Sequence, residues 1–206
     1  MALSGNDVFI KGQHLVLKVL GKDDVSNSNW YGWFNDEETT YHLQKHYFPN
    51  SRDRQMEFFG GIERDTTKIQ LGIVPNGEER IAGVISLQSI NWINRNAEIS
   101  MIIGEAKYRQ LVYAQEALKL MIEHAFYALN LHKVRVGYLE SLTDWGVFMK
   151  RRFGFQDEGR RREHVYKHGR YVDVYLLGLL RSEYKASTDA GDGMESQEAQ
   201  AILDKG

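Results

Sequence analysis

The chain of 206 residues contains no cysteine. This absence excludes disulfide bonds, zinc sites built from thiolates and a cysteine nucleophile. It fits a reducing compartment, where disulfides are rare. The sequence also lacks an excess of one charge, because 26 lysines and arginines nearly balance 28 aspartates and glutamates. There is therefore no global positive field of the kind that attracts nucleic acid.

Long apolar runs are absent as well. No window approaches the roughly 18 uninterrupted apolar residues that a membrane-spanning helix requires. The first residues, MALSGNDVFIKG, lack the basic segment followed by an apolar run that marks a secretory signal peptide. Hydrophobic residues make up 42% of the chain and charged residues 26%, as in ordinary globular proteins. We therefore expect a cytoplasmic protein with no membrane partner.

The composition changes once along the chain. Residues 186–206, ASTDAGDGMESQEAQAILDKG, are small, polar and mildly acidic. Such a composition predicts a disordered or loosely helical tail. The remaining length suits one domain. We assign that domain to residues 9–185, after an N-terminal extension of residues 1–8.

The spacing of apolar residues predicts the secondary structure. We expect strands at 14–20, 68–74, 80–90, 97–104 and 133–139, and two more within 153–180 that are joined by a loop and a turn at 167–170. We expect helices around 24–33 and 37–44, after Ser51 as N-cap, at 112–129, and from about 143 with Thr143 or Ser141 as cap. This order predicts an α+β fold in which the 112–129 helix crosses between two adjacent strands.

The segment YRQLVYAQEAL, residues 108–118, runs from a polar turn into the most regular of these helices. A loop that enters a helix can hold a phosphate on its backbone N–H groups. Loops of this kind are normally rich in glycine, because the ligand must come close to the backbone. This segment contains no glycine, so by itself it predicts only the start of a helix.

Five segments in a fixed order carry a resemblance to a known family. They are WFNDEETTYHL, AEISMIIG, YRQLVYAQEALKLMIEHAF, LHKVRV and RRFGFQDEGRRREHVYKHGRYVDVYLLGLL. The sequence resembles the GNAT superfamily of acyl-CoA-dependent N-acyltransferases, and within it the RimJ/RimL-like branch, over roughly residues 9–184. The resemblance implies a mixed, mostly antiparallel twisted sheet of six to seven strands, flanked by helices and splayed at the acyl-CoA site. It also implies acetyl-CoA as cosubstrate, no metal and an assembly that can be a homodimer.

In this family the loop between the fourth strand and the next helix binds the pyrophosphate of acyl-CoA through Gln/Arg-x-x-Gly-x-Gly/Ala. The resemblance therefore assigns donor binding to Arg109, Gln110, Leu111, Val112, Tyr113 and Ala114. Val112 stands where the family has glycine. A β-branched residue takes positive φ poorly, and its methyl groups narrow the path of the pyrophosphate. We expect a weakened or reshaped phosphate cradle.

A second departure lies in the helix after the fifth strand, where the family often has Asn-x-x-Ala-x-x-x-Tyr. Thr143 replaces the asparagine and can still hydrogen-bond to the pantetheine arm. Lys150 replaces the tyrosine that protonates the departing thiolate. A thiol pKa of about 8.5 makes thiolate a tolerable leaving group, so the loss slows the reaction without forbidding it. Lys150 could instead attract the phosphates of CoA.

The reaction that the resemblance implies is direct attack of an amine on a thioester. The amine must first lose a proton to a general base. Strand alternation places Glu98, Ser100 and Ile102 on one face. Glu98 is the candidate base, the alternative being a solvated glutamate at a strand end, and Ser100 is the second candidate catalytic residue. Backbone groups of Ile102 and Ile103 would contact the pantetheine, and neighbouring N–H groups would stabilise the oxyanion.

The acceptor is less well defined. Aromatic residues are dense near the N-terminus, and Trp33, Tyr41 and Tyr47 could wall an acceptor site or belong to the core. Residues 46–55 resemble amino-sugar acetyltransferases of surface-glycan pathways, which favours a nucleotide-linked amino sugar as the acceptor. The alternatives are a protein N-terminus, a small amine, or a non-catalytic binding module, the last motivated by Val112 and Lys150.

Two further features have two interpretations each. His42 and His46, four residues apart on an expected helix, could be metal ligands or a surface pair. Residues 159–163, GRRRE, could bind an anion or form a solvated loop.

Overall fold

The structure, a computed structural model, describes residues 7–185, so the expected C-terminal tail lies outside the described residues. Its strands are β1 (Val8–Lys11), β2 (Leu15–Val19), β3 (Ile69–Pro75), β4 (Gly83–Asn91), β5 (Asn96–Ile103), β6 (Lys133–Leu139), β7 (Gln156–Lys167) and β8 (Arg170–Leu180). Its α-helices are α1 (Lys22–Asn27), α2 (Trp30–Trp33), α3 (Glu37–Thr40), α4 (Arg52–Ile62), α5 (Leu111–Glu123) and α6 (Thr143–Phe153). None of the helices between residues 7 and 185 is long and apolar enough to cross a membrane.

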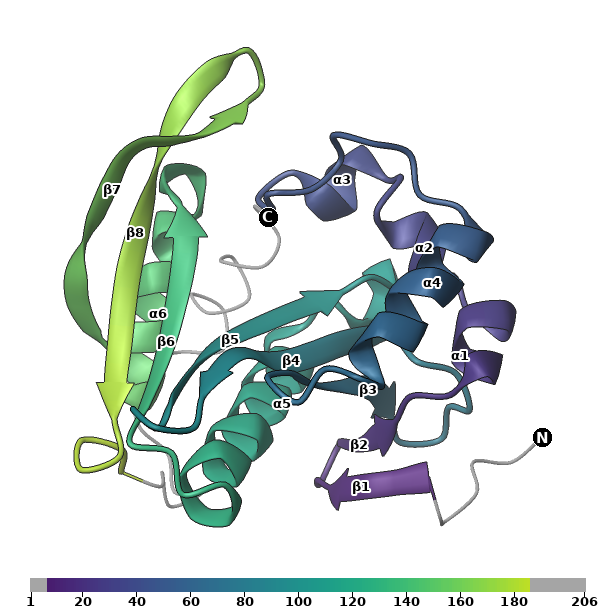
Figure 1. Ribbon diagram of the computed structural model, residues 1–206, viewed down its shortest axis with the longest axis horizontal. Helices are drawn as coiled ribbons and strands as arrows, with labels where there is room; N and C mark the ends of the chain where they lie inside the picture. Colours follow the sequence, from purple (N-terminus) through teal and green to yellow (C-terminus); the bar gives the residue numbers. More distant parts are fainter. Residues whose placement is uncertain (1–6, 186–206) are drawn as a thin grey trace.

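All eight strands belong to one twisted sheet in the order β1-β2-β3-β4-β5-β6-β8-β7 (Figure 1). Neighbouring strands are antiparallel except β5 and β6, which are parallel and are joined by the crossover helix α5. The predicted α+β fold with a mixed, mostly antiparallel sheet is confirmed. The sheet has eight strands rather than the predicted six to seven, because β1, a four-residue strand, also pairs with β2 at the edge of the sheet.

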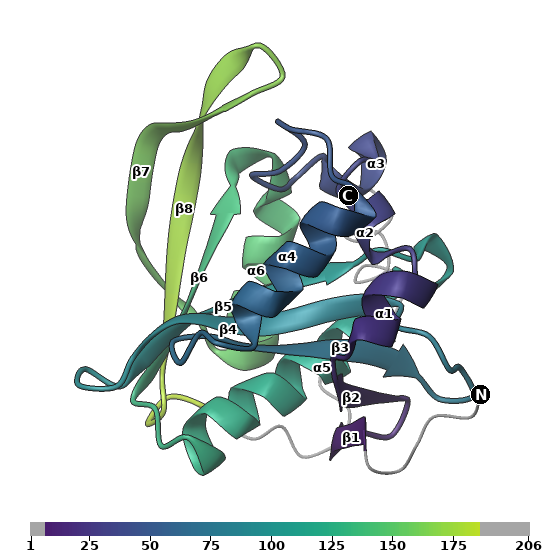
Figure 2. The same ribbon diagram turned by 45° about the vertical axis from the view of Figure 1, so that its right-hand side comes forward.

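Both faces of the sheet are covered between β2 and β5. Figure 2 shows α5 on one face and α1, α2 and α4 on the other. The alternation along β2 follows this division: Leu15 and Leu17 are fully buried in the core that includes α5, whereas Val16 packs toward the other helices. The β7–β8 hairpin extends beyond these layers, and the side chains of Gln156–His164 on β7 are exposed.

Three local predictions differ from the structure. Helix α3 ends at Thr40 rather than near residue 44, and His46 has a φ of 72°, so His42 and His46 do not share a helical face. Helix α6 begins after a short 3₁₀ turn, and neither expected hydroxyl caps it, since its N-cap is Leu142. Residues 159–163 belong to strand β7 instead of a loop, because an edge strand with charge on both faces lacks the usual alternation. The Ser51 cap of α4 is confirmed, since its side chain accepts a hydrogen bond from the backbone N–H of Arg54.

The end of β5 packs closely against helix α2. A Cβ atom at Gly104 would lie 1.9 Å from Cδ2 of Trp33, whose indole is 1% exposed. The indole Nε1 donates to Glu105 at 3.0 Å, so the ring cannot move without losing that bond. The end of β5 can therefore approach the N-terminal helices this closely only because residue 104 is a glycine.

We expect Gly104→Ala to lower the free energy of unfolding by about 1–3 kcal/mol, because the added methyl group overpacks the site. Gly61→Ala in helix α4 is the matched control, since nothing lies within 4 Å of its added Cβ. That control should be neutral or stabilising, as alanine is the better helix former. Urea unfolding of both variants tests this, and a Gly104→Ala variant as stable as the unchanged protein would contradict it.

Candidate active site

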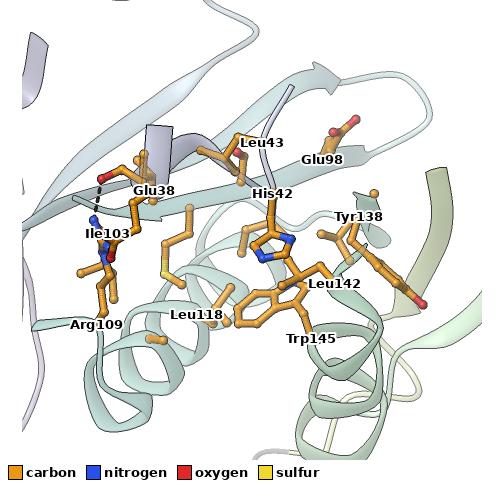
Figure 3. Close-up of a pocket in the computed structure, with 18 residues that line it drawn as sticks. Glu38, His42, Leu43, Glu98, Ile103, Arg109, Leu118, Tyr138, Leu142 and Trp145 are labelled. Atoms are coloured by element: carbon orange, nitrogen blue, oxygen red, sulfur yellow. Dashed lines mark hydrogen bonds and ion pairs between the residues drawn. The ribbon is translucent and has the colours of Figure 1, made fainter. Parts of the chain in front are cut away.

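A cavity opens where β5 and β6 separate. The two strands pair over three positions only, from Asn96 opposite Lys133 to Glu98 opposite Arg135. Beyond Glu98, β5 stays paired with β4, and β6 stays paired with β8. The space between the diverging strands is a cavity of about 220 Å³, shown in Figure 3. The splayed sheet that the resemblance implied is therefore present.

Glu98 lies at the point of divergence and lines the cavity (Figure 3). Its side chain is partly exposed, and no residue between 7 and 185 forms a hydrogen bond or an ion pair with its carboxylate. The buried neighbours Ala97 and Ile99 face the core that includes α5. Glu98 thus projects from the opposite face, at the inner end of the cavity.

The remainder of β5 forms one wall of the cavity. Ser100, Ile102 and Ile103 all line it, as the sequence predicts. Ser100 is exposed, and its carbonyl accepts a hydrogen bond from the hydroxyl of Ser86 at 3.5 Å. Ile102 packs toward the N-terminal helices and Ile103 toward the core that includes α5, so these side chains fix the strand from both faces. The edge of β5 that faces the cavity has no partner strand at these positions.

The segment 109–114 lies at the start of α5, as predicted. Ala114 is buried and lines the cavity, whereas Val112 is 41% exposed. Val112 belongs to the helix and has no positive φ, so the backbone conflict expected for valine does not arise. Gln110 is the N-cap residue, and its side-chain amide donates to the carbonyl of Lys107 at 2.8 Å. Tyr113 packs edge-on against Tyr108, with ring centroids 5.3 Å apart.

The side chain of Arg109 is held by hydrogen bonds to α3 and to the end of β5. Its guanidinium donates to Glu38 Oε1 at 2.8 Å, to the hydroxyl of Thr39 and to the carbonyls of Ile103 and Gly104 at 3.3 and 3.2 Å. Its side chain is 19% exposed. The hydrogen-bond donors of this guanidinium are therefore engaged by other groups of the protein.

The two residues at the departures in α6 lie outside the cavity lining. Thr143 is exposed at the first position of the helix. The Lys150 Nζ forms an ion pair with Asp157 of β7, at 3.0 Å from Oδ2. Helix α6 contributes Trp145 to the cavity instead, and Leu142, the residue just before this helix, lies beside Trp145 (Figure 3).

The segment after α3 closes the cavity from the side of the N-terminal helices. His42 and Leu43 point into the cavity in Figure 3. His42 Nδ1 lies 2.9 Å from the hydroxyl oxygen of Ser141, which connects this segment to the loop before α6. Glu38, within α3 itself, also lines the cavity.

The three aromatic residues predicted to wall the acceptor have different positions. Trp33 is buried in the core of the N-terminal helices and does not line the cavity. Tyr41 is 45% exposed and stacks on His168, with ring centroids 4.3 Å apart. Tyr47 is 50% exposed, and its hydroxyl donates to the carbonyl of Tyr166. The two tyrosines thus contact the tip of the β7–β8 hairpin.

Lys167 joins that hairpin tip to the segment after α3. It is 7% exposed, and its ammonium group donates to the carbonyls of Thr40 and Lys45, each at 3.0 Å. The same ammonium lies 5.6 Å from the centroid of the Tyr47 ring. Burial lowers the pKa of Lys167 from its ordinary value.

We expect Lys167→Met to lower the free energy of unfolding by about 1–3 kcal/mol, because the buried carbonyl of Thr40 and the partly buried carbonyl of Lys45 lose their donor. Hydrogen exchange should accelerate at the tip of the hairpin in this variant. Lys22→Met, an exposed lysine at the start of α1, is the control and should leave both quantities unchanged. Equal exchange rates at the tip in the Lys167 variant and the unchanged protein would contradict the expectation.

Several lining residues were not among the predicted site residues: Glu38, His42, Leu118, Tyr138, Leu142 and Trp145. They come from four segments that meet only in the folded chain. One signal was available, since the apolar stripe of α5 contains Leu118 next to Ala114, which was predicted. Although Tyr138 lines the cavity, its hydroxyl points toward Gly146 rather than into the cavity (Figure 3). A Cβ atom at Gly146 would lie 2.3 Å from that hydroxyl oxygen.

Comparison with known proteins gives consistent matches. Residues 14–143 match the model of the acetyltransferase (GNAT) domain family. A spermidine N(1)-acetyltransferase of Vibrio cholerae is 30% identical over 114 residues, 54% of this chain and 64% of the relative. The putative ribosomal N-acetyltransferase YdaF of Bacillus subtilis is 30% identical over 122 residues, 59% of this chain and 64% of the relative. The chain thus spans less than two thirds of the length of these two relatives.

Solved structures share the fold. A crystal structure of spermidine N-acetyltransferase from Vibrio cholerae in complex with CoA and spermine superimposes with a TM-score of 0.75. The comparison covers 84% of this chain and 99% of that chain, at 23% identity. At this identity the likeness concerns the fold.

Proposed function

Because the chain belongs to the GNAT acetyltransferase family, we propose that it transfers an acetyl group from acetyl-CoA to a small amine, with a polyamine such as spermidine as the acceptor class. The family match confirms the predicted enzyme class at that level. The observation that carries the proposal is the cavity at the divergence of β5 and β6, with the unpaired carboxylate of Glu98 at its inner end.

The residues around the cavity fit acetyl-CoA. The open edge of β5 beyond Glu98 offers backbone N–H and C=O groups for an amide-containing arm. The N-terminal end of α5 presents the positive end of a helix dipole to a pyrophosphate. When bound there, acetyl-CoA supplies the thioester carbon that the amine attacks.

Glu98 is the residue to which we assign the general base. A primary amine is protonated in water near neutral pH and must lose a proton before it can attack. The carboxylate of Glu98 accepts this proton directly or through one water. Backbone N–H groups along the edge of β5 stabilise the oxyanion that forms on the attacked carbonyl. No side chain is assigned to protonate the thiolate, since Lys150 is bound to Asp157 outside the cavity lining.

A small cationic acceptor suits the charge around the cavity. Glu38 and Glu98 contribute carboxylates to its lining, and Arg109 neutralises part of this charge through its ion pair with Glu38. The spermidine acetyltransferase relatives favour the small-amine alternative over the nucleotide-linked amino sugar expected from residues 46–55. The YdaF relative keeps a protein N-terminus as the second candidate.

An acceptor screen tests this assignment. Spermidine, spermine, a peptide with a free N-terminus and a nucleotide-linked amino sugar are each incubated with acetyl-CoA, and released thiol is measured. We expect the polyamines to have the highest kcat/KM. A higher kcat/KM for the peptide or the amino sugar would mean that the acceptor belongs to that class and is not a polyamine. Failure to bind acetyl-CoA at millimolar concentration in calorimetry would overturn the proposed acetyl transfer.

We expect Glu98→Gln to lower kcat by about 10²–10⁴-fold, the usual contribution of general acid–base catalysis. Affinity for acetyl-CoA should stay nearly unchanged, because the side chain lies beyond the assigned donor groups. Glu63→Gln, an exposed glutamate after α4, is the control. Unchanged turnover in the Glu98 variant would remove this residue from the mechanism.

We expect Val112→Ala to bind CoA severalfold more tightly in calorimetry. The change removes two exposed methyl groups at the start of α5 and retains a good helix former. Val112→Gly should show the same direction, with some loss of helix stability. Identical affinities in all three proteins would mean that Val112 does not lie at the pyrophosphate.

A further inference from the structure

Arg109 connects the two halves of the proposed site. Along the chain it comes directly before Gln110, the N-cap of α5, and therefore adjoins the groups assigned to the donor phosphates. In space its guanidinium reaches α3, the segment that leads to His42 and Leu43 on the acceptor side (Figure 3). One side chain thus spans from the donor loop to the acceptor wall.

The contacts on each side of this guanidinium are specific. Toward the sheet it donates to the carbonyls of Ile103 and Gly104, the last groups of β5. Toward α3 it donates to Glu38 at 2.8 Å and to the Thr39 hydroxyl, and it lies 3.9 Å from Asp36. A planar guanidinium with five donors in fixed directions can hold these groups at once, which a lysine ammonium cannot do with the same geometry.

The partners on α3 belong to the turn that starts the helix. Asp36 is the N-cap of α3 and accepts hydrogen bonds from the backbone N–H and the hydroxyl of Thr39. These hydrogen bonds, together with the charge of Arg109, lower the pKa of Asp36. The carboxylate is therefore ionised at neutral pH, and the cap and the guanidinium form one network.

The other end of the same segment is also held by a cation. Lys167 binds the carbonyls of Thr40 and Lys45, after α3. The acceptor wall, residues 36–47, thus has one anchor on the β7–β8 hairpin and one on the donor loop. Of these two anchors, Arg109 is the one whose backbone adjoins the assigned CoA site.

We propose that Arg109 is a positioning residue that couples donor binding to the order of the acceptor wall, residues 36–47. This inference rests on the proposed function, since it takes CoA as the ligand of the α5 N-terminus. CoA bound there fixes the loop from which Arg109 extends, and Arg109 then holds α3. Any two ligands linked in this way strengthen each other's binding by the same factor.

Hydrogen–deuterium exchange with CoA as the only ligand tests the proposal. In the unchanged protein CoA should slow exchange both at 110–118 and at 37–47. In Arg109→Gln the protection at 110–118 should remain, whereas the protection at 37–47 should be lost. Protection at 37–47 that persists in the variant, or that never appears in the unchanged protein with CoA bound, would overturn the proposal.

Further variants distinguish the loss of coupling from a folding defect caused by the change at Arg109. Glu38→Met with Thr39→Val removes the two α3 side chains that accept hydrogen bonds from Arg109 and leaves the carbonyl contacts to β5 and the more distant Asp36, so it should reproduce most of the loss at 37–47. Arg109→Lys should restore only part of the protection. Lys107→Gln is the matched control, because this cation of the same loop pairs with Glu78, away from the cavity lining. It should behave as the unchanged protein.

The outcome also separates this inference from the proposed function. If CoA does not bind the unchanged protein, both are overturned. If CoA binds and protects only 110–118, the coupling is overturned and the transferase assignment stands. If Arg109→Gln weakens CoA binding more than tenfold while CoA still protects 37–47, Arg109 is a phosphate ligand, as the family pattern suggests, and not a coupling residue.

Discussion

The short ladder between β5 and β6 is the constraint on which the site depends. Three paired positions hold the parallel strands together, and the pairing ends at Glu98. The end of this pairing creates three features that the proposed chemistry needs. They are an open backbone edge on β5, a cavity between the two strands, and the Glu98 carboxylate where the strands diverge. Had the ladder continued, β6 would have covered the edge that we assign to the donor.

The surrounding elements keep this opening from collapsing. Helix α5 fills the space beneath the divergence with Ala114 and Leu118, and Trp145 of α6 closes it from the side of β6. On the opposite face, the close contact between Gly104 and Trp33 sets the position of the N-terminal helices. Arg109 and Lys167 then hold residues 36–47 across the mouth. Packing therefore shapes the cavity, and a few charged groups position residues 36–47.

Sequence reasoning succeeded where the signal is local. Periodicity predicted α5 and seven of the eight strands, and the ordered motifs predicted the splayed sheet. It did not predict contacts between distant segments. The motif position of Arg109 is local, whereas its hydrogen-bond partners on α3 lie about seventy residues earlier in the chain. Residues 159–163 of the edge strand β7 were predicted as a loop, since both faces are exposed there and no alternation remains.

The geometry of the sheet has a mechanical consequence. Its two parts, β1–β5 and β6–β8, share one short seam at Asn96–Glu98 and diverge from there. A rotation of one part against the other is smallest at the seam and grows with distance along the strands. The largest displacement therefore falls at the far end, where the hairpin tip meets residues 40–47 and the Lys167 ammonium spans the gap. Glu98 lies at this seam, and the hydrogen bonds of Lys167 join the two parts at the opposite end.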